Sequence, residues 1–249
     1  MFPIEVTDFE SQGVTLAIAT DPDFDARAQA ILAGYASPVL ALKPFLAIVS
    51  NYDSRTVVAY TVGWTVTRRN GFTEANTTQF KFPDAVAGTG NGLAVLQGRE
   101  IRTGEERLVG MGFEVWPVEY VEQYREFGEH ERKDLGDVKG LQVSLDAVIF
   151  DDGTLLGPDN SRLAEHFIAY VQAKQALYRD VVVGLETRGV DADVFAGLRE
   201  TAASRPNLAD PMGLYPHQAA AEILGWRDRI LLEVFRRALR REAFTVKRQ

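Results

Sequence analysis

Residues 38–69 show the clearest alternation of apolar and polar positions, in two runs with the character of β-strands. Residues 50–55, which join the runs, are rich in Asn, Asp and Ser and suit a turn. The alternation and the turn together predict a β-hairpin. In the second run every second residue is apolar, as on one face of a strand, and this predicted core face comprises Val58, Tyr60, Val62, Trp64 and Val66.

Further strand-like segments occur at residues 78–82, 93–96, 108–116 and 141–150. Gly-containing or charged connections separate them, and few helical patterns intervene. Several short strands in succession are typical of a β-sandwich.

The period changes to that of a helix after Gly157 and Pro158. Residues 159–161 supply Asp, Asn and Ser side chains that suit a helix cap, and Asp159 is the candidate cap. A helix of about six turns should follow. Its expected apolar face consists of Leu163, Phe167, Tyr170, Val171, Leu177, Tyr178 and Val181.

Two more helices are expected, one near residues 191–203 and a last one that begins near Pro216. The apolar positions of the first are Val194, Phe195 and Leu198, and those of the second are Ile223, Trp226, Ile230, Val234 and Phe235. Strands come first and helices last, so the predicted class is α+β: an immunoglobulin-like antiparallel β-sandwich with a C-terminal helical region.

The predicted division of the chain is an N-terminal strand or helix segment at 1–35, a β-sandwich at 36–157 and a helical region at 158–249. Within the first segment, residues 21–35 suggest a short helix whose shared face holds Phe24, Ala28, Ile31, Leu32 and Tyr35. Residues 122–139 are dense in charge and predict a long solvated loop, where a function could reside.

Composition and charge narrow the class of protein. The chain has 249 residues, of which 46% are hydrophobic and 25% charged, as in globular proteins. The formal net charge of −8 argues against nonspecific binding of nucleic acid or anionic membrane. Cysteine is absent from the sequence, which excludes disulfides, thiol nucleophiles and thiolate metal sites.

Targeting signals are not evident either. Residues 1–8 carry Glu5 and Asp8 where a signal peptide has basic residues, and the apolar run at 39–49 is broken by Lys43 and Pro44. We therefore expect neither export nor a membrane span, with the cytoplasm as the default location.

Three segments resemble parts of known bacterial proteins. Residues 45–64, with Asn51 and Ser54 in a turn before a strand that ends in Trp64, resemble paired strands of bacterial immunoglobulin-like domains. Residues 98–107 resemble the hairpin that follows in such domains. Residues 144–159 are similar to a segment of uncharacterised bacterial proteins that join such a sandwich to C-terminal helices. The resemblance implies a fold and no activity, and antibody-type features are not carried over because the Cys pair is absent.

Four carboxylates fall within a short stretch: Asp146, Asp151, Asp152 and Asp159. Such oxygen clusters suit a hard cation such as Ca²⁺. The competing interpretation is structural, with Asp152 and Gly153 in a hairpin turn and Asp159 as a helix cap. Alternation places Asp146 on the polar face beside Gln142 and Ser144, and calcium-loop spacing is missing, so the structural interpretation is favoured.

Other motifs favour structure over chemistry. Residues 88–93 contain three glycines but precede a strand-like segment, so a dinucleotide site is not expected. His130, His166 and His217 lack metal-ligand spacing, and surface or capping roles are expected for His166 and His217. The last helix carries Arg227, Arg229, Arg236, Arg237, Arg240 and Arg241, for which a salt-bridged solvated face is favoured over an RNA or lipid site.

The sequence contains no motif that fixes a reaction, so a noncatalytic interaction or structural protein is favoured over an enzyme. We assign no catalytic, cofactor-binding or metal residue and expect no cofactor. The expected partner is another protein, neither nucleic acid nor membrane, and self-association through the helices stays open. The alternative is a hydrolase or a small-ligand or metal-binding protein with its site near Asp151, Asp152 and Asp159.

Overall fold

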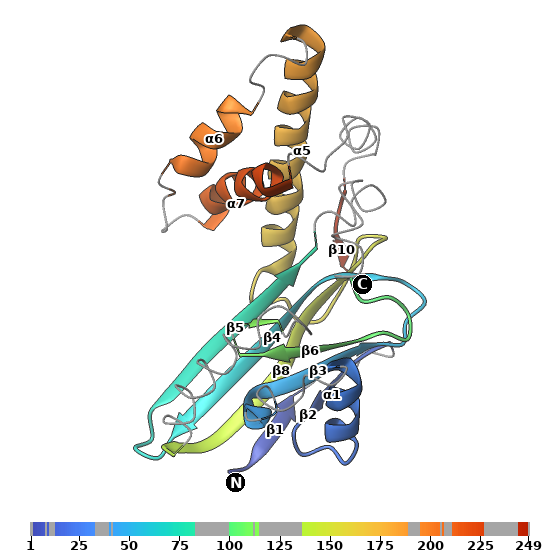
Figure 1. Ribbon diagram of the computed structural model, residues 1–249. Coiled ribbons are helices and arrows are strands. Elements are labelled where there is room, and N and C mark those ends of the chain that lie inside the picture. Colours follow the sequence, from blue (N-terminus) through green and yellow to red (C-terminus); the bar gives the residue numbers. More distant parts are fainter. Residues whose placement is uncertain are drawn as a thin grey trace. The chain divides into compact units, whose positions relative to one another are not determined.

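The computed structural model has both sheets and helices, which confirms the α+β class (Figure 1). It describes residues 2–7, 9, 13–32, 40, 42–82, 100–111, 113–114, 136–188, 195–204, 206, 211–226 and 244–248. The chain forms two compact units. The first comprises Met1–Phe80, Ile101–Val148 and Leu156–Ser161, and the second comprises Lys81–Glu100, Ile149–Leu155 and Arg162–Gln249.

One antiparallel sheet of the first unit is built in the order β2-β3-β6-β7. Its strands are β2 (Val14–Ile18), β3 (Leu46–Asn51), β6 (Glu106–Gly110) and β7 (Phe113–Glu114). Helix α1 (Phe24–Leu32) packs on this sheet, as Figure 1 shows. Its buried face confirms part of the predicted helix and contains Phe24, Ala28 and Leu32, which pack with Ala17, Leu46, Ile48 and Leu108.

The other sheet contains β1 (Ile4–Thr7), β4 (Val57–Arg68), β5 (Thr73–Lys81), β8 (Val138–Phe150), β9 (Thr154–Leu156) and β10 (Lys247–Arg248). Its order is β10-β9-β8-β4-β5, and β1 also pairs with β8. The β1–β8 pairing is parallel and sets Ile4 opposite Leu141. The N-terminal strands β1 and β2 are thus integrated into the two sheets. The predicted boundaries at residues 35 and 157 stay a prediction.

The predicted hairpin over residues 38–69 is wrong, although both of its strands exist. β3 and β4 belong to different sheets, so the segment between them carries the chain from one sheet to the other. Asn, Asp and Ser favour a change of direction but do not specify which strand the chain pairs with afterwards. β4 is instead followed by its sheet neighbour β5, through a turn in which Gly71 has φ of +85° and Arg68 donates its N–H to the Phe72 carbonyl at 2.8 Å.

The predicted core face of β4 is confirmed, since Val58, Tyr60, Val62, Trp64 and Val66 are all buried. The opposite face is buried as well at its beginning, where Val57, Ala59 and Thr61 are fully covered. Thr61 is satisfied by a hydrogen bond from the Ser161 hydroxyl at 3.1 Å. Alternation alone did not indicate that both faces of this strand are covered.

The other strand predictions differ in extent. β5 begins before the predicted 78–82 segment, β8 begins before 141, and the predicted 108–116 strand is divided into β6 and β7. Residues 93–96 lie outside the described residues. So do residues 122–135 of the predicted loop, whereas Val138 and Lys139 at its end already belong to β8.

The second unit contains helices α5 (Leu163–Arg188), α6 (Ala196–Ala203) and α7 (Pro211–Trp226). Helix α5 confirms the predicted long helix, with Leu177 partly buried and the other expected apolar residues buried. A core common to the three helices is formed by Tyr178, Val181, Val182, Leu198, Ala220 and Ile223. No helix within the described ranges is long and apolar enough to cross a membrane.

The predicted start of the last helix at Pro216 is wrong. Helix α7 begins at Pro211, and Pro216 lies inside it. Pro211 occupies the first helical position, where a missing N–H is harmless, and this signal was overlooked. Ile223 is buried as expected. The side chain of Trp226 and residues 227–243, with the six arginines, lie outside the described part of the structure.

Candidate functional site

Asp146 on β8 serves as a structural acceptor rather than as an open carboxylate. It is only 8% exposed. Its Oδ1 accepts a hydrogen bond from the N–H of Asn160 at 3.1 Å, and its Oδ2 accepts one from Ser161 at 2.9 Å. The Asp146 carbonyl also accepts from the N–H of Asp159 at 3.4 Å. Through its carboxylate and its carbonyl, Asp146 therefore holds residues 159–161 on β8.

Asp151 and Asp152 occupy the turn between β8 and β9, and both are exposed. Gly153 has φ of +85° and donates its N–H to the Phe150 carbonyl at 3.0 Å. Asp152 Oδ1 accepts a hydrogen bond from Thr154 N–H at 2.9 Å. The hairpin interpretation of this Asp-Gly turn is confirmed, and the arrangement argues against a ligand site at its tip.

Asp159 is not the cap of the long helix, because α5 begins at Leu163 and Asp159 has φ of +56°. The prediction that Asp159 caps this helix is therefore wrong. Residues 159–161 instead form the turn that Asp146 holds. Among the described residues no group of three or more His, Cys, Asp or Glu side chains is placed to hold a metal ion. The four carboxylates are close in sequence without forming such a group.

A hydrogen-bonded loop cluster at one end of the first unit is better defined. Its centre is Asn51, the buried last residue of β3. Asn51 Nδ2 donates to the carbonyls of Arg55 and Ile101, both at 2.8 Å, and Oδ1 accepts from Asp53 N–H at 3.0 Å. The side chain thus ties the connection between β3 and β4 to the segment before β6.

The turn of residues 102–105 closes onto this connection. Gly104 donates its N–H to the Asn51 carbonyl at 2.7 Å, and Asn51 donates to the Glu105 carbonyl at 3.0 Å. The Thr103 hydroxyl donates to the Asp53 carbonyl at 2.7 Å. Gly104 has φ of +79°, a region that glycine adopts without strain.

The side chains of Asp53 and Arg55 form an ion pair within the same cluster. Their Oδ2 and Nη2 atoms are 2.8 Å apart. The hydrogen bond from Arg55 lowers the pKa of Asp53 to about 2, against the opposing effect of burial. The Asp53 N–H donates to the Gly13 carbonyl at 3.1 Å, and a Cβ at Gly13 would lie only 2.7 Å from the Cβ of Asp53.

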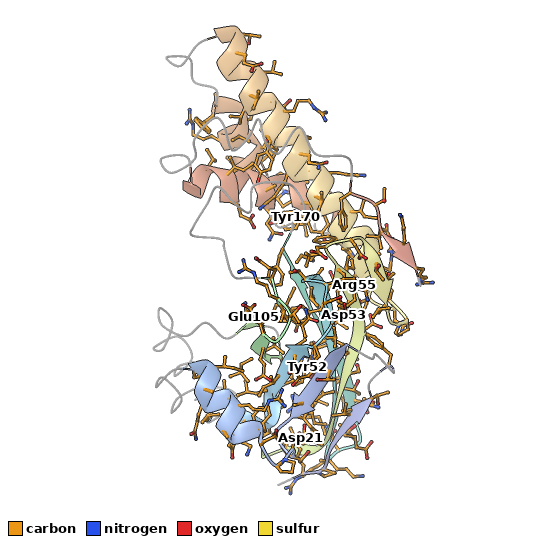
Figure 2. The ribbon with its side chains drawn as sticks, turned by 90° about the vertical axis from the view of Figure 1, so that its right-hand side faces the viewer. Asp21, Tyr52, Asp53, Arg55, Glu105 and Tyr170 are labelled. Atoms are coloured by element: carbon orange, nitrogen blue, oxygen red, sulfur yellow. The ribbon has the colours of Figure 1, made fainter. Side chains whose placement is uncertain are left out.

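Tyr52 projects from this rigid backbone into solvent. The Tyr52 N–H donates to the Gly13 carbonyl at 2.6 Å, while the Tyr52 side chain is 59% exposed. Figure 2 labels it near Asp53, Arg55 and Glu105. We call Gly13, residues 51–55 and residues 102–105 the Tyr52 platform. Tyrosine is one of the residue types enriched among the anchors of protein interfaces.

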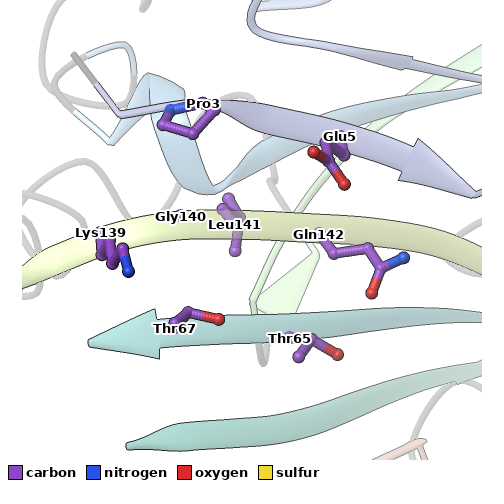
Figure 3. A pocket seen from close by; sticks show the side chains of 8 residues that line it. All are labelled: Pro3, Glu5, Thr65, Thr67, Lys139, Gly140, Leu141 and Gln142. Atoms are coloured by element: carbon purple, nitrogen blue, oxygen red, sulfur yellow. The ribbon is translucent and has the colours of Figure 1, made fainter. Parts of the chain in front are cut away.

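A shallow hollow of about 260 Å³ lies on the exposed face of β1, β4 and β8 (Figure 3). Gly140 lies in the central strand, Thr65 and Thr67 line one side, and Glu5 lines the other. Lys139 and Gln142 complete the polar lining. The hollow is open and its lining is mixed in charge, so it offers less to a partner than the exposed ring of Tyr52.

A seam of polar and aromatic side chains joins α5 and α7 in the second unit. Lys174 is fully buried, and its Nζ lies 2.6 Å from Glu222 Oε2. The Tyr170 hydroxyl donates a hydrogen bond to the other oxygen of Glu222. Tyr170 also stacks on Tyr215, with ring centroids 5.1 Å apart. The Tyr215 hydroxyl lies 2.7 Å from His166 Nδ1.

Lys81, the last residue of β5, extends this seam. Its Nζ donates to the Tyr215 hydroxyl at 3.4 Å and lies 5.3 Å from the centre of the Tyr215 ring. Burial lowers the pKa of Lys81 to about 8 and raises the pKa of Tyr215 to about 12. The amine is therefore partly deprotonated near neutral pH while the phenol keeps its proton.

Sequence reasoning missed this seam. His166, Tyr170 and Lys174 recur at intervals of four and so share one face of α5. That spacing was a usable signal, but it gave no information on Tyr215 and Glu222. A surface or capping role was expected for His166, and the structure shows the residue half-buried and in contact with Tyr215. His217 lies in α7, 3.2 Å from the hydroxyl of Ser204 at the end of α6, and His130 lies outside the described residues.

No protein-family model, no curated protein and no solved structure matches this chain.

Proposed function

We propose that the chain is a noncatalytic protein-interaction module built on an immunoglobulin-like sandwich, with the Tyr52 platform as its contact surface. The observation that carries the proposal is the exposed Tyr52 ring on a backbone held by hydrogen bonds from three separate segments. Because this backbone is ordered before binding, a partner would not have to supply the free energy to order it.

The order of the strands supports the immunoglobulin-like part of the proposal. The chain crosses repeatedly between the two sheets: it passes from β3 to β4, back from β5 to β6, and across again from β7 to β8. Such crossings are typical of Greek-key sandwiches. With the sequence resemblance, this supports a relationship to the bacterial immunoglobulin-like proteins.

Loop clusters at the ends of such sandwiches are the usual place for partner contacts, which is a fold-level analogy. The Tyr52 platform is such a cluster, formed by the connection between sheets and the turn before β6. Its charged groups have both signs, with Arg55 paired to Asp53 and Arg107 to Glu105. A protein partner suits an aromatic anchor with a mixed-charge rim better than a nucleic acid does.

Site-specific photo-crosslinking tests the proposal. A benzophenone amino acid is placed at position 52 in one protein and at position 72 in another, because Phe72 is 61% exposed on the β4–β5 turn and lies outside the platform. We expect a discrete crosslinked partner from position 52 and none of the same mass from position 72. Equal products from both positions would contradict the proposal.

The earlier placement of the contact surface at residues 122–139 stays a separate prediction. It is tested by deleting residues 122–135, which spares the start of β8 at Val138. Loss of the position-52 crosslink in this deletion would show that the loop contributes to the contact surface. An unchanged crosslink would show that it does not. Sedimentation at several protein concentrations shows whether the captured partner is a second copy of the chain.

A further inference from the structure

Lys81 differs in its surroundings from the other buried lysine of the second unit. Lys174 is fully buried against the carboxylate of Glu222 at 2.6 Å. Lys81 is half-buried, and its Nζ lies over the Tyr215 ring and within 3.4 Å of the Tyr215 hydroxyl. Burial beside the Tyr215 ring lowers the pKa of Lys81 to about 8.

The Tyr215 hydroxyl links Lys81 to an imidazole. Its oxygen accepts a hydrogen bond from Lys81, and in the tautomer with Nδ1 unprotonated its proton points to His166 at 2.7 Å. Stacking of Tyr170 on Tyr215 fixes the plane of the phenol. Tyr170 is itself held by Glu222, which pairs with Lys174, so every titratable group of the seam has a defined partner.

A partly deprotonated amine next to a phenol and an imidazole is the arrangement that imine formation needs. We propose that Lys81 is a reactive amine that forms imines with small aldehydes, with Tyr215 as the proton donor. This inference concerns the second unit and does not depend on the proposed protein-binding surface of the first.

The step balances without an external oxidant or reductant. The Lys81 amine adds to the aldehyde carbon, and one amine proton moves to the new alkoxide, which gives a carbinolamine. The Tyr215 phenol then protonates the carbinolamine hydroxyl, the C–O bond breaks and water leaves. The iminium nitrogen returns its remaining proton to the Tyr215 phenolate, so the products are a neutral imine, water and the original phenol. His166 orients the phenol through the bond at Nδ1.

Reductive trapping tests the proposal on the full chain. Protein is incubated with glyoxylate and cyanoborohydride, which reduces any imine to a stable secondary amine, and labelled lysines are quantified by peptide mass spectrometry. Lys139, exposed on β8, is the internal reference for an ordinary surface amine. At pH 7.5 we expect Lys81 to be labelled about tenfold faster than Lys139, because burial lowers the pKa of Lys81 and Tyr215 supplies a proton donor. The labelling rate of Lys81 should reach half of its maximum near pH 8, in keeping with its lowered pKa of about 8.

The variant Tyr215→Phe distinguishes the effect of the phenol hydroxyl on Lys81 reactivity from the effect of burial under the ring. It keeps the ring that covers Lys81 and removes the hydroxyl, so labelling of Lys81 should slow severalfold while labelling of Lys139 is unchanged. Circular dichroism and the melting temperature establish that the variant is folded. The proposal is overturned if Lys81 in the parent protein reacts no faster than Lys139. The role of Tyr215 as the proton donor is overturned if Lys81 in folded Tyr215→Phe protein is labelled at the parent rate.

Discussion

Lys174 Nζ lies 2.6 Å from Glu222 Oε2, and this contact joins the middle of α5 to α7 with the lysine wholly removed from solvent. A buried ammonium is tolerated only when it is paired, because its desolvation otherwise opposes folding. Glu222 remains 29% exposed on its side chain, so the two partners are not equivalent. Loss of the carboxylate leaves a buried charge, whereas loss of the lysine leaves a carboxylate that water can still reach.

The first prediction follows from this asymmetry. Glu222→Ala should reduce the free energy of unfolding by about 3 kcal/mol, because it leaves Lys174 without its carboxylate. Lys174→Met, which keeps much of the side-chain volume, should be less destabilising than Glu222→Ala. Urea denaturation of both variants measures the difference. Glu200→Ala on the exposed face of α6 is the control and should fall within about 0.5 kcal/mol of the parent. An equal effect of the two seam variants would contradict the asymmetry.

The second prediction concerns pH and the Tyr52 platform. The folded state lowers the pKa of Asp53 from the ordinary 3.8 to about 2 through the hydrogen bond from Arg55. The ionised form therefore stabilises the folded state fully above about pH 4, and this contribution is lost as pH falls from about 4 to about 2. Asp53→Asn should have a lower melting temperature than the parent at pH 7, and the difference should shrink over that range. A constant difference would show that the charge of Asp53 is irrelevant.

The third prediction separates the structural carboxylate from the exposed ones. Asp146→Ala removes the acceptor of two backbone N–H groups and should destabilise the protein by about 1–3 kcal/mol. Asp151→Asn at the exposed turn should leave the unfolding midpoint almost unchanged. In thermal denaturation of the parent protein, added Ca²⁺ or chelator should leave the melting temperature unchanged. A Ca²⁺-dependent rise that Asp151→Asn abolishes would restore the ligand-site alternative.

Two glycines with the same backbone angle give the fourth prediction. Gly153 and Gly71 both have φ of +85°, but a Cβ at Gly153 would lie 2.1 Å from the Thr245 carbonyl oxygen, while nothing lies within 4 Å at Gly71. Gly71→Ala should destabilise by about 1 kcal/mol, the penalty for a left-handed conformation. Gly153→Ala should be considerably worse, because the Cβ also displaces the backbone that leads into β10. Equal unfolding midpoints in urea would contradict this close approach.

Periodic features of the sequence predicted the elements well but not their pairing. Alternation in β4 and the helical spacing from Leu163 to Val181 both identified the right buried faces, because these patterns depend only on neighbours along the chain. The pairing of β3 and β4 was misjudged because the composition of a turn does not encode the sheet that the chain enters next. Asn70 and Gly71 were an available signal for the true turn after β4, since Asn-Gly favours tight hairpins.

The candidate sites were harder to predict for a similar reason. Asp146 lies on the polar face that alternation assigned to it, yet its burial depends on Asn160 and Ser161 folding back over it. The Tyr52 platform requires Gly13, Asn51 and Glu105 to meet, and the seam requires Tyr215 to meet His166. Such contacts between distant segments leave no periodic trace in a single sequence.

The affinity of the crosslinked partner for three purified proteins provides the most direct test of the interaction-module proposal. The parent, Tyr52→Ala and Phe72→Ala are compared by calorimetry, and the two variants remove aromatic rings of similar exposure, 59% and 61%. We predict that Tyr52→Ala weakens binding about tenfold or more, as expected for an aromatic anchor, and that Phe72→Ala binds like the parent. Parent-like binding by folded Tyr52→Ala protein, or equal weakening by both variants, would contradict the assignment of the Tyr52 platform as the contact surface.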